Sequence, residues 1–86
     1  MDDLTRCLYE FLMETRMGRI WEDEEYKACN SGLLLQEQRV RSRLSGEQEA
    51  ELDRFLDCML ERDSVEKEHL FQSTLDLLRE LSALAG

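Results

Sequence analysis

The chain has 86 residues with 20 acidic and 11 basic side chains, a net charge of −9, three cysteines and no proline. One domain over residues 1–86 is expected, and the acidic balance argues against direct nucleic-acid binding, which depends on Lys and Arg neutralising phosphates. The odd cysteine count, the absence of a signal peptide and the lack of a run of about 20 apolar residues predict a cytoplasmic protein with reduced thiols and no membrane contact.

Apolar residues recur at helical spacing near the start of the chain, which predicts an amphipathic helix over about residues 2–15. The stripe consists of Leu4, Cys7, Leu8, Phe11 and Leu12. We expect Gly18 to end this helix as a left-handed cap. Ile20 and Trp21 follow in a short connection, where we expect them to tuck under the helices because exposing such side chains is unfavourable.

A second helix is predicted over about residues 22–44, because four carboxylates begin it and three arginines end it, as the helix dipole favours. Its expected core face consists of Tyr26, Cys29, Leu33, Val40 and Leu44. Gly32 lies in the middle of this segment and costs about 1 kcal/mol relative to alanine, which makes this the weakest of the predicted helices.

The sharpest boundary lies at Ser45. The run Ser45-Gly46-Glu47-Gln48 matches a capping box, so we expect one helix to end and the next to begin within one or two residues of Ser45. So short a connection predicts an antiparallel hairpin. We expect ion pairs across this hairpin that join Arg39, Arg41 and Arg43 to Glu47, Glu49 and Glu51.

The third helix is predicted to run unbroken from Ser45 to Leu84, about 38 residues or about 57 Å. Only Asp63-Ser64 interrupts its apolar stripe, and we expect the helix to continue through it. The first two helices together would measure about 55 Å, so we expect them to lie end to end along the third, with the first on its C-terminal half. This flat arrangement leaves an apolar side uncovered.

The C-terminal part of the third helix predicts self-association. Its apolar side chains span about 180° of the circumference, more than one neighbouring helix can cover. A two-fold homodimer is the commonest way to cover the remainder. We therefore expect an all-α fold of three helices, with a hairpin of the second and third and a bundle completed by a second copy. The expected interface includes the first helix and Leu70, Phe71, Leu75, Leu78, Leu81 and Leu84.

Candidate metal ligands are few. Glu66 and His69 form the E-x-x-H pattern of di-iron bundles, which need two copies and further carboxylates. The three cysteines with His69 could in number form a zinc site, but their spacing matches no zinc motif. We expect Cys7 and Cys29 to be small core residues, and no cofactor to be bound.

The acidic run at residues 22–25 is similar to the Mg²⁺-binding runs of all-α nucleotide pyrophosphatases, but no second acidic motif accompanies it. Dipole complementation is the simpler explanation. The sequence offers no nucleophile motif around its single histidine and no glycine-rich phosphate loop, so we expect a protein that is not an enzyme.

The whole pattern resembles a family of roughly 90-residue helical proteins of unknown function from Gram-positive bacteria. The matching residues are Leu8-Tyr9, Glu25-Tyr26, Leu44-Ser45, Glu47-Gln48, Phe71 and Leu75. The resemblance implies no activity. Three hypotheses remain open: a self-associating protein that works through protein contacts, an acidic modulator or decoy of a nucleic-acid-binding system, and a metal-dependent helical-bundle enzyme.

Overall fold

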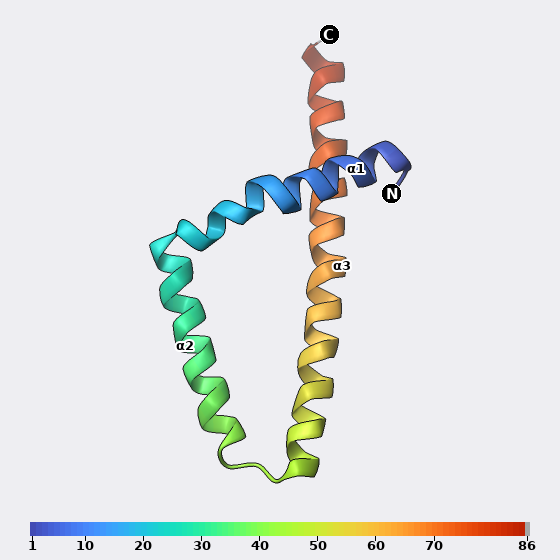
Figure 1. Cartoon of the computed structure of the whole chain (residues 1–86). Helices are drawn as coiled ribbons and strands as arrows, with labels where there is room; N and C mark the ends of the chain where they lie inside the picture. Colours follow the sequence, from blue (N-terminus) through green and yellow to red (C-terminus); the bar gives the residue numbers. More distant parts are fainter. Residues whose placement is uncertain (86) are drawn as a thin grey trace.

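The computed structural model describes residues 1–85 and contains only helices and their connections over that range (Figure 1). The elements are α1 (Asp3–Phe11), a π-helical turn η1 (Leu12–Arg16), a 3-10 helix η2 (Met17–Glu22), α2 (Glu24–Arg41) and α3 (Gly46–Ala85). The expected all-α fold with three helices is confirmed.

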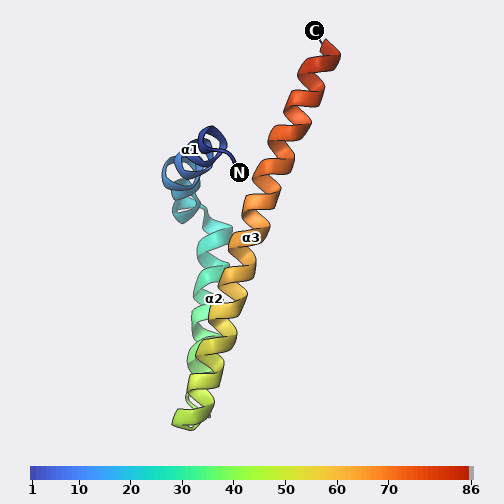
Figure 2. The same ribbon diagram turned by 90° about the vertical axis from the view of Figure 1, so that its right-hand side faces the viewer.

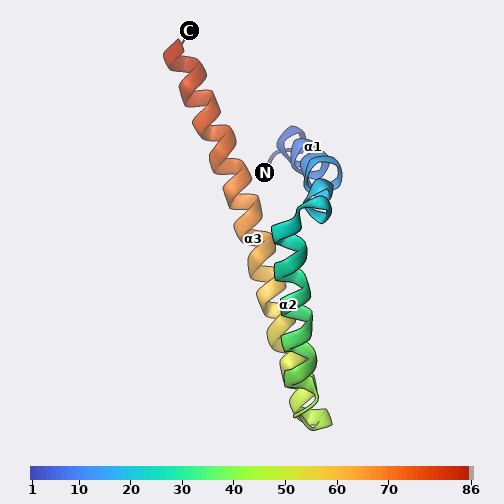
Figure 3. The same ribbon diagram turned by 90° about the vertical axis from the view of Figure 1, so that its left-hand side faces the viewer.

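The helices form an open frame. In Figure 1, α2 and α3 run antiparallel as its two sides, and the segment from α1 to η2 crosses over α3 and closes the frame. Figures 2 and 3 show α2 beside the first half of α3, with α1 on one side of α3 only. The radius of gyration is 18.1 Å, against about 12 Å for a compact domain of this length. The chain is therefore extended.

The N-terminal helix does not stop at Gly18. The backbone widens into η1 and tightens into η2, so helical turns carry the chain through to Glu22. No glycine among residues 1–85 has a positive φ, so the expected left-handed cap is wrong. Asp23 instead begins the next helix, since its Oδ1 accepts a hydrogen bond from the Tyr26 amide at 2.7 Å.

Helix α2 is shorter than predicted at both ends. The Asp23 cap fixes its start, and it ends at Arg41, four residues before Ser45. Ser42 follows the last helical residue and donates its hydroxyl to the Arg39 carbonyl at 2.8 Å, the kind of local bond by which serine competes with helix continuation. Gly32 does not break the helix.

The start of α3 follows the predicted capping box. The Ser45 hydroxyl accepts a hydrogen bond from the Gln48 amide at 3.4 Å, and the Gln48 side chain accepts one from the Ser45 amide at 3.0 Å. From there α3 continues for 40 residues, through Asp63 and Ser64 without a break. Its length of about 60 Å matches the longest dimension of the chain, 60 Å.

The first two helices do not lie end to end along α3. Helix α1 crosses α3 in its C-terminal half, as Figure 1 shows, and only α2 runs beside it. The half of α3 that α1 contacts agrees with the prediction, but the direction of α1 does not. Because the segment from α1 to η2 must reach the start of α2 across the frame, it leaves α3 after one short contact.

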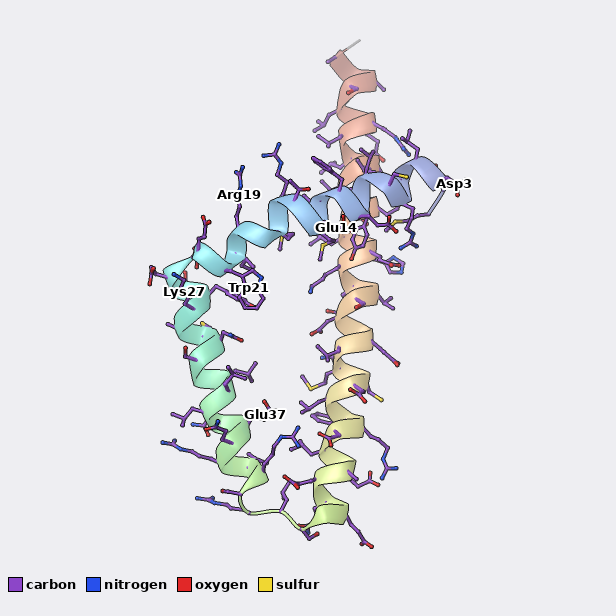
Figure 4. The ribbon with its side chains drawn as sticks, viewed as in Figure 1. Asp3, Glu14, Arg19, Trp21, Lys27 and Glu37 are labelled. Carbon is purple, nitrogen blue, oxygen red and sulfur yellow. The ribbon has the colours of Figure 1, made fainter. Side chains whose placement is uncertain are left out.

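Within residues 1–85 the chain buries no apolar side chain, and Thr5 alone is buried. The expected core face of α2 is therefore wrong in part: Tyr26 and Leu44 are half-buried, whereas its other members are exposed. Trp21 is 60% exposed, contrary to the prediction. Figure 4 shows it pointing into the open frame and Arg19 pointing away, and the indole meets the Tyr26 ring in a T-shaped arrangement, at 5.3 Å between ring centroids.

One arginine ties the hairpin together near its loop. Arg41 Nη2 lies 2.7 Å from Asp53 Oδ1 of α3 and 3.0 Å from Glu37 Oε1 of its own helix. The prediction of ion pairing across the hairpin is correct for Arg41 but gave the wrong partner. Among residues 1–85, Arg39 and Arg43 form no ion pair, and Glu51 pairs with Arg54 of α3.

The capping box yields a first test. Ser45→Ala should lower the free energy of unfolding by about 1 kcal/mol, because the Gln48 amide loses its acceptor. Ser45→Asp should leave it nearly unchanged, since aspartate also caps helices. Urea unfolding followed by circular dichroism measures both. Equal losses in the two variants would show that Ser45 is not an N-cap in solution.

Candidate functional site

Helix α1 is held on α3 by two neighbouring contacts. Arg6 Nη1 donates to Glu68 Oε1 at 2.8 Å, and Tyr9 meets the ring of Phe71 edge to face at 5.4 Å between centroids. Thr5 is 2% exposed beside them. Arg6 and Tyr9 are three residues apart on α1, so they lie on one face of that helix. Their partners on α3, Glu68 and Phe71, are also three residues apart and share one face of α3.

The same contact shifts two carboxylates. The hydrogen bond from Arg6 lowers the pKa of Glu68 below its ordinary value of 4.5. At the start of α1, the Thr5 amide donates to Asp2 Oδ1 at 2.8 Å, and this bond lowers the pKa of Asp2. Both groups are therefore held in their charged form, and neither resembles a proton donor or acceptor poised for catalysis near neutral pH.

Beside this anchor, α1, η1 and α3 enclose an apolar groove of about 310 Å³. We call it the α1–α3 groove. Its lining consists of Tyr9, Leu12, Met13, Met17, Lys67, Leu70, Phe71, Thr74, Leu75 and Leu78. Its polar groups are the Lys67 ammonium and the hydroxyls of Tyr9 and Thr74, and the lining contains no carboxylate, thiol or imidazole.

The groove brings together four of the six predicted interface residues: Leu70, Phe71, Leu75 and Leu78. The other two, Leu81 and Leu84, lie beyond it near the end of α3 and are 53% and 85% exposed. All six therefore lie on the part of α3 that extends past α2.

The sequence interpretation missed the contribution of the segment after α1. Met13 and Met17 line the groove from η1 and the start of η2. Together with Tyr9 they follow an i, i+4, i+8 spacing that could have revealed them. The prediction ended the helix near residue 15 and so left Met17 out of any apolar face.

The proposed metal ligands do not converge. Cys7, Cys29 and Cys58 are all exposed, so the expectation that the first two are core residues is wrong. Cys7 and Cys29 lie on apolar stripes that are covered only in part, at Leu12 on the first and at Tyr26 and Leu44 on the second. Residues 1–85 contain no group of three His, Cys, Asp or Glu side chains that could hold a metal ion. Glu66 pairs instead with Arg62 at 3.7 Å.

Protonation of Glu68 provides a test of the anchor. A carboxylate whose pKa is lowered on folding stabilises the fold above its unfolded pKa, and that contribution disappears as the pH falls through the folded pKa. The extra stability of the wild type over Glu68→Gln should therefore be constant above about pH 5 and vanish at lower pH.

Urea unfolding at a series of pH values measures this difference. Glu61→Gln is the control, because Glu61 lies on the same helix and forms no ion pair among the described residues. A Glu68 difference that stayed constant down to pH 2 would rule out the Arg6 contact in solution.

Comparison with known proteins gives one match. The chain matches the profile of a family of unknown function, DUF6809, over residues 1–79. No curated protein and no solved structure matches it. Within residues 1–85, no helix combines the length and apolar character that crossing a membrane requires. The match spans all three helices and the α1–α3 groove, and the chain belongs to the DUF6809 family.

Proposed function

We propose that this protein is a cytoplasmic homodimer that works through protein–protein contacts and is not an enzyme. The observation that supports this proposal is the exposed area of the single chain, 7404 Å². A compact monomer of 10.2 kDa exposes about 5,300 Å². Each chain therefore exposes about 2,100 Å² more than a stable monomer of its mass.

The excess exposed area of each chain is of the size that a permanent dimer buries. If two chains each covered the excess against the other, the interface would bury about 4,200 Å², within the range of obligate homodimers. Such interfaces resemble a domain core divided between two chains, which would suit a chain whose described residues, 1–85, bury no apolar side chain of their own.

The character of the exposed surface favours the C-terminal half of α3 as part of the interface. Leu70 is 69% exposed, Leu77 56% and Leu81 53%, and they continue the apolar surface of the α1–α3 groove. Contiguous apolar patches of this kind mark interaction sites on soluble proteins. The groove lining also supports a role without catalysis, because it presents no carboxylate, thiol or imidazole beside its Lys67, Tyr9 and Thr74.

Sedimentation equilibrium tests the proposal. The wild type should sediment as a dimer at micromolar concentration, and its melting temperature should rise with protein concentration. Leu81→Glu would bury an unpaired charge in the interface at a cost of several kcal/mol, so it should yield a monomer or an unfolded chain.

Ala83→Glu is the matched control. It adds the same charge two residues further along the same helix, about 160° away from the direction of Leu81 once the two steps of about 100° are counted. Ala83→Glu should leave the dimer intact. A wild type that remains a folded monomer near 10.2 kDa would refute the proposal.

A further inference from the structure

The exposed end of α3 and the α1–α3 groove adjoin each other and can be covered together. We propose that two copies of this chain pair the ends of α3 antiparallel, about a two-fold axis level with the bond between residues 75 and 76. Residues 67–84 of each chain then lie along the same segment of the other and close the mouth of its α1–α3 groove. This proposal rests on the self-association proposed above and adds the surface, the register and the occupant of the groove.

The end of α3 carries side chains at the spacing of a coiled coil. Six positions alternate three and four residues apart, which keeps one side of a helix against a partner helix. At about 100° per residue they fall within about 100° of the circumference. We call them the α3 seam: Lys67, Leu70, Thr74, Leu77, Leu81 and Leu84. All six are exposed in the single chain, and Leu84 is 85% exposed.

A second copy of the α3 seam is its best occupant. The excess exposed area of each chain calls for a cover, and a two-fold pair covers both chains with the same surface. In the antiparallel pair, Leu70 of one chain lies level with Leu81 of the other, and Thr74 with Leu77. Every layer of the pair therefore contains at least one leucine, as the layers of knobs and holes between paired helices require.

The charge of Lys67 also favours the antiparallel direction. Lys67 lies level with Leu84 of the other chain, at the outer end of the pair, and forms no ion pair of its own among residues 1–85. The last turn of α3, as described to Ala85, contains no basic residue. Because a helix C-terminus attracts cations, Lys67 of each chain would stabilise the end of the other chain's α3.

A parallel pair is unfavourable for two reasons. It would set Lys67 of one chain against Lys67 of the other, and like charges that face each other in an interface repel. It would also continue along α3 toward the hairpin loop, where Arg41 of α2 already binds Asp53 and α2 lies beside α3 (Figures 2 and 3). In the antiparallel pair, the first half of the other chain's α3 lies beyond Ala85 and meets neither α2 nor the loop.

The partner helix would also close the α1–α3 groove. Lys67, Leu70 and Thr74 belong both to the α3 seam and to the groove lining. Met13 and Met17 line the same groove from η1 and η2. A helix that lies along the seam therefore passes the mouth of the groove and meets these methionines, whose unbranched side chains adapt to irregular surfaces. The groove of about 310 Å³ would receive apolar side chains of the other chain's seam.

Cysteine crosslinking between two differently tagged chains tests the register. Cys7, Cys29 and Cys58 are first replaced by serine, which their exposure permits. One chain then carries Leu70→Cys and the other Leu81→Cys, and the two are unfolded in urea, refolded together and oxidised. We expect disulfides between the two kinds of chain, because residues 70 and 81 lie level on facing helices.

The control mixes Leu70→Cys with Ala83→Cys. Ala83 is exposed and lies about 160° around α3 from Leu81, so its thiol would lie on the far side of the helix. Crosslinking of this pair should be at least about tenfold slower, since a disulfide needs its Cβ atoms within about 4.5 Å. Lys67→Cys with Leu84→Cys provides a second level pair at two exposed positions, which keeps the register testable if Leu70→Cys weakens the dimer.

A charge placed in the groove tests its closure. Met17→Glu adds a carboxylate to the lining that the other chain covers, so the dissociation constant of the dimer should rise at least about tenfold. Thr15→Glu adds the same charge two residues earlier, outside the groove lining, and should leave the constant nearly unchanged. Sedimentation at a series of concentrations measures both. Equal constants for Met17→Glu and the wild type would overturn the closure of the groove.

The outcomes separate this proposal from the one on which it rests. A monomer in sedimentation would overturn both. A dimer whose disulfides join 70 to 70 and 81 to 81, or in which neither level pair reacts faster than the control, would overturn this proposal alone. Mixed disulfides between 70 and 81 and between 67 and 84, with slow reaction at 83, would establish the antiparallel register.

Discussion

Helix α3 runs from Gly46 to Ala85 without a break, and the rest of the chain is too short to cover it. Helix α2 lies beside its first half and α1 crosses its second half once, as Figure 1 shows. The hairpin, the open frame and the exposed end of α3 all follow from this mismatch in length. A helix of about 60 Å in a chain of 86 residues cannot be enclosed by its own neighbours.

The contacts that hold the frame together are single polar or aromatic contacts, most of them at least partly exposed. Asp2, Asp23 and Ser45 cap the three helices, Arg6 and Tyr9 attach α1 to α3, and Arg41 joins the two sides near the loop. Exposed ion pairs contribute little to stability, because water screens them and ordering the side chains costs entropy. These contacts therefore set the directions of the helices, while in the homodimer proposed above most of the free energy of folding would come from apolar surface that the single chain leaves open.

The sequence predicted the features that depend on neighbours along the chain. The capping box at Ser45 and the continuity of α3 through Asp63 and Ser64 depend on hydrogen bonds between groups a few residues apart, and both are confirmed. The prediction failed at Gly18, because glycine was taken as a left-handed cap, whereas a π-helical turn followed by a 3-10 helix carries the chain past it.

The predictions of burial failed for a different physical reason. Cys29 and Leu33 were expected in a core because they lie on a helical stripe, yet both are exposed. Periodicity identifies the side of a helix that needs covering, but it does not state which chain supplies the cover. At the α1–α3 groove the leucines of α3 were predicted but Met13 and Met17 were not, because the predicted apolar stripe stopped at Leu12 and the predicted helix ended near residue 15.

The difference between a helix side that needs covering and the chain that covers it also bears on the polar interruption in α3, at Asp63 and Ser64. Within one chain, Asp63 and Ser64 look like a weak point where a helix could end. On a helix that stays intact, Asp63 becomes a half-buried charge in the middle of an apolar stripe, four residues from a lysine of opposite sign. Such a placement is unfavourable unless the charge meets a partner. In the homodimer proposed above, the polar interruption would lie at the end of the interface, where water meets the charge, so it would be a feature of the interface and not a weak point of the helix.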